Sequence, residues 1–171
     1  MLVRIVVVIL ITVGIVAGAF YGLTKRYQVP TRAMEPTLAK DDKVAVFRFW
    51  STFSSPERKN VVVFAPPPSA KAQCGVRGNQ VERVIGLPGE TVSEQTGQVL
   101  IDGKPLKESY VKAARRDSQT AAWHVPPGQY FLMGDNRKAA CDSRTFGSVP
   151  KNDIEGRVVL TYWPLSRVGS D

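Results

Sequence analysis

The residue types that most often bind metals or act as acid–base catalysts are scarce in this chain of 171 residues. It contains one histidine and two cysteines, too few for a zinc module built from Cys and His ligands. Its glycines form no phosphate loop of the Walker type, which argues against a nucleoside triphosphatase. His124 lies between Trp123 and Val125 in a strand-like stretch, a position typical of a packed or surface histidine. These residue types predict no metal site.

Cys74 and Cys141 are the only two cysteines. A single pair of this kind favours a disulfide, and disulfides persist in oxidising compartments. The alternative is two reduced thiols that are buried in the core. The first interpretation places the protein outside the cytoplasm.

The N-terminal residues differ in composition from the rest of the chain. Residues 5–23 contain no charged side chain, and a helix of that length spans about 28 Å, close to the hydrocarbon thickness of a bilayer. Arg4 precedes this apolar run and residues 25–27 (Lys-Arg-Tyr) follow it, as interfacial anchors do. We predict an uncleaved transmembrane anchor over residues 1–28. A cleaved signal peptide is the alternative, because residues 17–19 (Ala-Gly-Ala) offer a cleavage site, but the apolar run exceeds the usual length.

Most of the remaining chain has the composition of β-strands. Short runs rich in β-branched and aromatic residues are separated by Gly, Pro and Asp-Gly, and no longer segment beyond the N-terminus shows helical periodicity. The predicted strands cover residues 43–49, 60–65, 80–85, 91–93, 98–101, 129–133 and 156–163. We expect exposed loops at residues 66–79 and 113–122. The pattern predicts a mostly β protein, with one antiparallel barrel or coiled-sheet domain over residues 29–171.

Several segments of this domain resemble the sequence signatures of type I signal peptidases. They are residues 29–38 (VPTRAMEPTL), 42–46 (DKVAV), 58–64 (RKNVVVF), 81–90 (VERVIGLPGE) and 134–147, which contains GDNR and CDSR. The segments follow one another in the family's order. The resemblance implies the family's β fold behind one N-terminal transmembrane helix, and it implies no metal or organic cofactor.

The same resemblance locates the catalytic positions. The family cleaves preproteins with a serine that attacks the scissile carbonyl and a desolvated lysine that accepts the serine proton. In this chain Ala33 occupies the nucleophile position, Glu82 the general-base position, and Ala140 the position of a serine that orients the lysine. We therefore predict that the chain is inactive or severely impaired as a peptidase.

The residues that recognise substrate are retained. By resemblance, the Thr31 hydroxyl and the backbone N–H of Ala33 form an oxyanion pocket. The segments 27–32 and 79–82 would hold a signal-peptide C-region as an added β-strand, and small pockets would select Ala at positions −1 and −3 of the cleavage site. The substrate-binding residues expected in these segments are Tyr27, Gln28, Val29, Pro30 and Val81.

Charged residues near the catalytic positions are expected to form a scaffold. The family pattern implies two ion pairs, Arg83 with Asp135 and Asp142 with Arg144. If Glu82 points into the former lysine pocket near Asp142, the two carboxylates repel and one pKa rises. The alternative is a Glu82 side chain that is turned outward.

The charge distribution bears on partners and location. The net charge is +8, of which residues 1–28 carry +3. The basic residues do not form an aromatic-interleaved patch, so an anionic membrane surface explains the charge better than a nucleic acid. The charge bias around the anchor favours a cytoplasmic domain, whereas the cysteines favour the opposite side. We expect a single-pass protein of the plasma membrane with its domain on the extracytoplasmic face.

Two functional hypotheses follow. The first is a membrane-anchored signal peptidase I homologue that recognises signal-peptide C-regions of secreted preproteins without cleaving them efficiently. The second is a non-enzymatic membrane-surface module that binds or regulates partners and carries a vestigial cleft.

Overall fold

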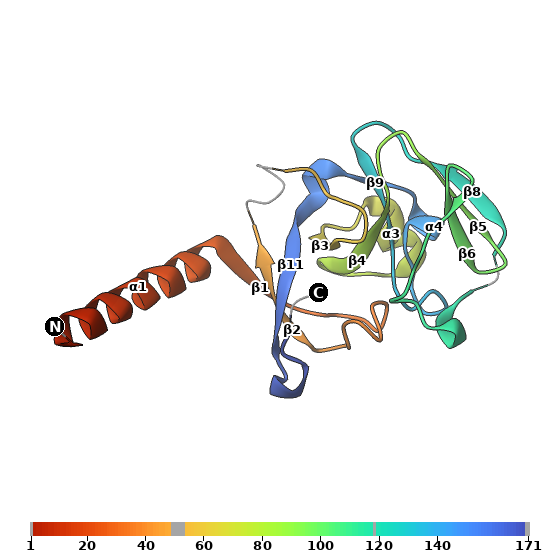
Figure 1. Ribbon diagram of the computed structural model, residues 1–171. Helices are drawn as coiled ribbons and strands as arrows, with labels where there is room; N and C mark the ends of the chain where they lie inside the picture. Colours follow the sequence, from red (N-terminus) through yellow and green to blue (C-terminus); the bar gives the residue numbers. More distant parts are fainter. Residues whose placement is uncertain (1, 49–53, 118, 170–171) are drawn as a thin grey trace.

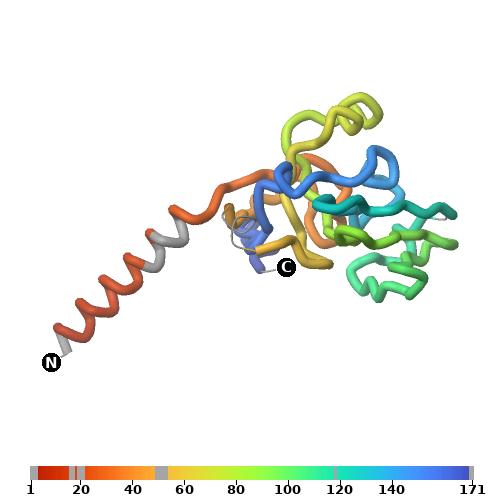
Figure 2. Tube along the Cα trace, turned by 90° about the horizontal axis from the view of Figure 1, so that it is seen from above, coloured from red at the N-terminus to blue at the C-terminus, as the bar shows by residue number. Residues whose placement is uncertain are grey.

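The computed structural model describes residues 2–48, 54–117 and 119–169. A helix, α1 (Leu2–Leu23), projects from a β body that contains the rest of the chain (Figures 1 and 2). The large apolar side chains of α1 that the structure describes are exposed, with Leu10 65% accessible. No helix in the described part of the chain, α1 included, combines the length and apolarity of a membrane span. The expectation of a transmembrane helix is therefore not supported.

The body consists of two antiparallel sheets. The larger has the order β1-β2-β11-β3-β4-β9-β10, and the smaller has the order β7-β6-β5-β8. The strands of the larger sheet are β1 (Thr24–Gln28), β2 (Lys43–Phe47), β11 (Ile154–Trp163), β3 (Val61–Phe64), β4 (Gln80–Gly86), β9 (Gln129–Met133) and β10 (Val149–Pro150). Those of the smaller are β7 (Lys104–Pro105), β6 (Gln98–Ile101), β5 (Thr91–Gln95) and β8 (Ala121–His124). The mostly β prediction is confirmed, and each predicted strand overlaps an observed one.

The centre of the larger sheet positions the candidate site. Strands β3 and β4 pair along their length and every residue in both is buried. Strand β3 (VVVF) is a continuous apolar run because both of its faces are covered, whereas β4 (QVERVIG) also buries Gln80, Glu82 and Arg83. Clusters of buried apolar side chains pack on the sheet, and one of them joins Ile85 and Phe131 to Val92 and Val99 of the smaller sheet.

Short helical segments complete the body, and the prediction missed them. They are α3 (Pro68–Cys74), α4 (Ser143–Phe146) and the 3₁₀ turns η1 (Ala113–Arg115), η2 (Lys151–Asp153) and η3 (Leu165–Arg167). Helix α3 occupies the expected loop 66–79. Its first residue is a proline, which suits the first turn of a helix, and it ends at Gly75 in the left-handed region with φ 63°.

Two strands that the sequence did not predict, β1 and β8, occupy stretches where an anchor and a loop were expected. Strand β1 pairs with β2 from Thr24 onward, inside the stretch expected to belong to the anchor, so residues 24–28 belong to the sheet. Strand β8 starts at Ala121, at the end of the expected loop 113–122, and pairs with β5. Each of these two strands contains few β-branched residues. Its extended structure therefore depends on pairing with the neighbouring strand more than on its own sequence.

Candidate functional site

Ala33 lies in the irregular segment between β1 and β2, and the GDNR segment holds its backbone. The Asn136 backbone N–H donates to the Ala33 carbonyl at 2.8 Å, and the Asn136 side-chain amide donates to the Arg32 carbonyl at 3.3 Å. Ala33 is 8% exposed. The residue at the nucleophile position is therefore fixed by residues about 100 positions away in the sequence.

Gly134 brings Ala33 and Ala140 together. A Cβ atom placed on Gly134 would lie 2.5 Å from the Ala140 Cβ and 2.6 Å from the Ala33 carbonyl oxygen. Only a residue without a side chain permits this approach. The structure thus gathers two of the three substituted catalytic positions around one glycine.

Glu82 belongs to β4 and faces the same region. Its neighbour Arg83 pairs with Met133 of β9, so continuing this register by one residue places Glu82 opposite Gly134. Directly opposed residues of an antiparallel pair project to the same face of the sheet. The Glu82 side chain therefore lies on the face where Ala33 and Ala140 meet.

The Glu82 carboxyl group is deeply buried. Its residue is 3% exposed, and its Oε2 has no hydrogen-bond partner among the described residues. Burial, and then the negative charge of Asp142, raise the pKa of Glu82 well above its ordinary value, while the charge of Arg144 opposes the rise. Of the two alternatives that the sequence left open, the structure shows the inward position, with Glu82 buried near Asp142.

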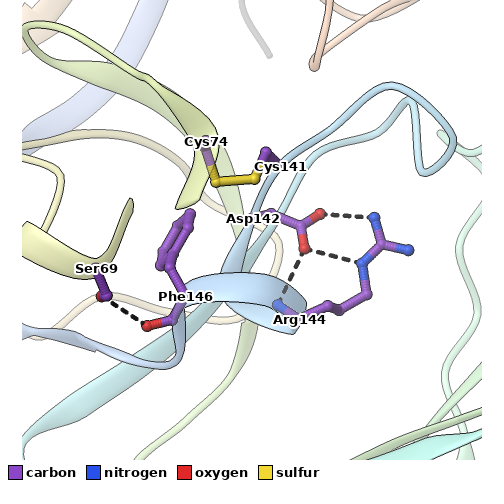
Figure 3. Close-up of a disulfide and its surroundings, with 6 residues drawn as sticks. All are labelled: Ser69, Cys74, Cys141, Asp142, Arg144 and Phe146. Atoms are coloured by element: carbon purple, nitrogen blue, oxygen red, sulfur yellow. Dashed lines mark hydrogen bonds and ion pairs between the residues drawn. A yellow bond between two sulfur atoms is a disulfide. The ribbon is translucent and has the colours of Figure 1, made fainter. Parts of the chain in front are cut away.

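Asp142 links this group to the loop that carries Ala140. One oxygen accepts from the Gly134 backbone N–H at 3.1 Å, and the side chain also caps α4 by accepting from the Arg144 backbone N–H. The Arg144 guanidinium donates two bonds to the same carboxylate, at 2.8 Å and 2.9 Å (Figure 3). Asp142 is therefore paired with Arg144 and also bonded to the backbone of Gly134 in the site.

Arg83 and Asp135 form a second buried pair beside the site. Two guanidinium nitrogens donate to the two carboxylate oxygens at 2.8 Å and 2.6 Å. The same guanidinium lies 4.1 Å from the centre of the Tyr110 ring, and Asp135 also accepts from the Thr37 hydroxyl at 2.5 Å. These contacts fix both ends of the pair.

The expected oxyanion residues lie together. The Ala33 backbone N–H donates to the Thr31 hydroxyl oxygen at 3.3 Å, a long bond for an amide donor. The Thr31 hydroxyl oxygen is the acceptor in this bond, so its proton remains available to another acceptor. The pair thus offers a weakly engaged N–H and a hydroxyl at the same place.

The residues expected to bind substrate are divided between core and rim. Val29 and Val81 are buried in one apolar cluster, against which Tyr27 packs. Pro30 is half-buried, and the exposed Gln28 donates its side-chain amide to Asp41 at 2.8 Å. The buried side chains of Val29 and Val81 therefore anchor the segments 27–32 and 79–82 in the same apolar cluster.

Sequence reasoning missed Glu155, which joins these two segments. Its carboxylate accepts from the Tyr27 hydroxyl and, at 2.7 Å, from the Asn79 side-chain amide. Burial raises the pKa of Glu155, but the bonds from Tyr27 and Asn79 and the charge of Lys25 outweigh it and lower the pKa. Burial in β11 alternates regularly through Glu155, so the local sequence gives it the pattern of an ordinary outward-facing residue and does not reveal its contacts with Tyr27 and Asn79.

A disulfide ties the site to α3. Cys74 at the end of α3 is bonded to Cys141, the residue that follows Ala140, with a Cα–Cα distance of 6.0 Å (Figure 3). The Ser69 hydroxyl donates to the Phe146 carbonyl at 3.0 Å and adds a second contact between α3 and α4. His124 is exposed on β8. Among the described residues, no three His, Cys, Asp or Glu side chains are grouped as a metal ion requires.

The chain is similar to known proteins over most of its length. The family described as "Signal peptidase, peptidase S26" matches residues 2–163. The chain is 39% identical over 142 residues to "Signal peptidase I" of Leptolyngbya laminosa, which covers 82% of this chain and 70% of that one. It is 37% identical over 141 residues to "Probable signal peptidase I-2" of a Synechocystis strain, with 82% and 64% covered.

A solved structure agrees with these matches. A crystal structure of a signal peptidase I from Enterococcus faecalis V583 is similar with a TM-score of 0.50 and 32% sequence identity. The match covers 61% of this chain and 97% of that one. The extent of the family match, the identities and the shared β fold agree, and the chain belongs to the signal peptidase family, peptidase S26.

Proposed function

We propose that this protein is a membrane-attached signal peptidase homologue that binds the C-regions of signal peptides and does not cleave them. The observation that carries the proposal is that Ala33, whose side chain is only a methyl group, has its backbone held beside Gly134, near Ala140, at the position where the family places its nucleophile. Belonging to the family supports signal peptides as ligands, and the substituted positions support the loss of catalysis.

No neighbouring group replaces the missing dyad. Thr31 is two residues from Ala33, so an attack by its hydroxyl would displace the reacting oxygen by several ångströms, whereas about 1 Å of misplacement costs roughly 100-fold in rate. Burial and the charge of Asp142 raise the pKa of Glu82, which favours its protonated form, and the methyl group of Ala33 gives it no hydroxyl to activate. Loss of the nucleophile leaves only binding and oxyanion stabilisation.

Recognition requires only groups that the chain retains. An extended peptide placed between the segments 27–32 and 79–82 would pair with their backbones as an added strand. Alternate side chains of that peptide would point to one side, where small pockets accept alanine and overpack with a larger residue. The buried Val29 and Val81 would form the apolar support for such pockets.

Helix α1 is the proposed membrane attachment. Its exposed apolar side chains, among them Val8, Ile11 and Ile15, would be covered by lipid. Lys25 and Arg26 follow it in β1 and would face anionic headgroups. We propose that α1, within residues 1–28, attaches the chain to the plasma membrane. The β domain of residues 29–171, which β1 joins at its edge, would lie on the extracytoplasmic face, where the Cys74–Cys141 disulfide would persist.

Peptide binding tests the recognition claim. A labelled signal-peptide C-region with Ala at −1 and −3 is titrated with the full-length protein in detergent, alongside the same peptide with Phe at −1. We expect saturable binding of the first peptide, at least tenfold weaker binding of the second, and no cleavage of either. Equal binding of both peptides, or of neither, would refute recognition and favour the membrane-surface module with a vestigial cleft.

A further inference from the structure

Glu82 leaves one strong hydrogen-bond acceptor without a partner inside the protein. Its Oε2 is buried and accepts no bond among the described residues. Such a group costs free energy unless a proton, a water molecule or a ligand satisfies it. The orphaned oxygen therefore indicates that a group with hydrogen-bond donors belongs beside it.

The charged side chains around Glu82 indicate whether the donor group beside it is a cation or an anion. Asp142 and Arg144 are the charged side chains that act on it directly. Arg144 is shared, because it is also paired with Asp117 at 2.9 Å and with Glu94 at 3.5 Å. One guanidinium therefore serves several carboxylates, and an ionised Glu82 adds a further negative charge. A cation complements this arrangement and an anion does not.

The surrounding groups select the kind of cation. Glu82 lies on the face where the Ala33 carbonyl and the Ala140 methyl meet, and the Thr31 hydroxyl oxygen lies beside the Ala33 N–H. The Ala33 carbonyl and the Thr31 hydroxyl are neutral acceptors. The Asp142 carboxylate is already engaged by Arg144 and by the Gly134 N–H, which leaves few oxygens for calcium, an ion that takes six to eight. An ammonium group, with three N–H donors and one charge, fits such a set.

We infer that the Glu82 site binds an ammonium group supplied by a polypeptide ligand, either the α-ammonium of an N-terminus or the side chain of a lysine. The family places a basic amine at this position, and the carboxyl group of Glu82 reverses the polarity. The inference rests on the proposed function, because the same two segments would deliver the polypeptide. Glu82 releases its proton to solvent when the ammonium group binds, so Glu82 is ionised in the complex.

The first test uses matched peptides with the full-length protein in detergent. One peptide pair begins at the residue after a cleavage site, with a free or an acetylated N-terminus. The other pair is a C-region extended beyond the cleavage site with lysine, or acetyl-lysine, as the next residue. We expect acetylation to weaken binding about tenfold in at least one pair, and the Glu82→Gln protein to lose that difference.

The pH dependence separates the two sources of the ammonium group. Because binding requires an ionised Glu82, whose pKa burial and Asp142 raise, affinity should increase as the pH rises from acidic values. An α-ammonium loses its proton near pH 8, so its affinity should fall above that value, whereas a lysine ammonium, with a pKa of about 10.4, should keep its affinity. Peptide binding that acetylation does not change refutes the inference and leaves the proposed function standing.

A second measurement does not depend on peptide binding. Propylammonium chloride is added to the unaltered protein and to the Glu82→Gln protein at neutral pH, with sodium chloride at equal concentration as the control. A ligand that binds only the folded state raises its Tm. We expect a higher Tm with propylammonium in the unaltered protein alone. Equal Tm values in the two salts, or the same rise in both proteins, overturn the inference even where no peptide binds.

Discussion

At the scale of single residues, Glu82 places a carboxyl group where its ionised form is poorly supported. In the unfolded chain the pKa of Glu82 has its ordinary value of about 4.5, and in the folded chain this pKa is raised. A carboxyl group with a raised pKa in the folded state contributes stability that is complete below the ordinary pKa. That contribution is lost as the pH rises toward the raised pKa.

Replacing Glu82 by glutamine should remove this pH dependence. In the unaltered protein, Glu82 should decrease the free energy of unfolding by up to about 1.4 kcal/mol per pH unit above the ordinary pKa. The Glu82→Gln protein should lack this component when urea unfolding is measured from about pH 5 to about pH 8. Glu57→Gln, at an exposed position, is the matched control. Identical slopes for the unaltered and Glu82→Gln proteins would show that Glu82 ionises freely.

The buried pair of Arg83 and Asp135 should be far more sensitive than an exposed pair. Asp135→Asn leaves the guanidinium of Arg83, 8% exposed, without its countercharge, and should lower the free energy of unfolding by about 3 kcal/mol or more. Lys25→Met breaks the pair between Lys25, 48% exposed, and Glu155, 31% exposed. This change should alter the free energy of unfolding by less than about 1 kcal/mol. Similar losses in the free energy of unfolding for Asp135→Asn and Lys25→Met, measured with urea, would contradict the difference in burial between the two pairs.

At the scale of elements, the site depends on the close approach of the segment around Ala33 to the start of the GDNR segment. Gly134 permits that approach, because a Cβ there would meet both a methyl carbon and a backbone oxygen. The Asn136 amide then holds the Ala33 carbonyl. The loop and the strand end therefore behave as one unit.

Gly134→Ala should disrupt this unit. The added methyl group should lower the free energy of unfolding by about 1–3 kcal/mol through overpacking, as measured by thermal or urea unfolding. Adding Ala140→Gly removes the contact at 2.5 Å but not the contact with the Ala33 carbonyl at 2.6 Å, so it should restore stability only in part. Full restoration would show that the backbone of Ala33 is not the limiting contact.

The predictability of these elements differed for physical reasons. The central strands were predictable because Val-rich runs such as residues 61–64 favour strands wherever they pack. Helix α3 was not, since its seven residues become ordered through tertiary contacts such as the burial of Ala70. The positions of Ala33, Glu82 and Ala140 followed from the sequence signatures. The inward direction of Glu82 followed only from the burial of β4 on both faces.

At the scale of the whole molecule, the surfaces of α1 and of the β body differ in chemical character. The helix exposes apolar side chains, while the chain as a whole carries a net charge of +8. Apolar area and basic charge act together in binding to anionic lipid. We therefore expect the protein to remain with membranes through α1.

Flotation with vesicles tests this attachment. The unaltered protein should float with vesicles that contain anionic lipid, and Ile9→Lys with Val13→Lys, two exposed positions on one face of α1, should abolish flotation. Ile9→Leu with Val13→Leu is the matched control and should float. Flotation of the lysine variant would contradict attachment through α1. Protease access to either side of sealed vesicles then tells a spanning helix from one that lies at the surface.

The central claim is that a signal peptidase fold with an intact recognition surface lacks only its catalytic groups. A preprotein is incubated in detergent with the unaltered protein or with a variant carrying Ala33→Ser, Glu82→Lys and Ala140→Ser, and release of the signal peptide is measured. We predict release by the variant and none by the unaltered protein. Release by the unaltered protein at a rate similar to that of the variant would contradict the claim.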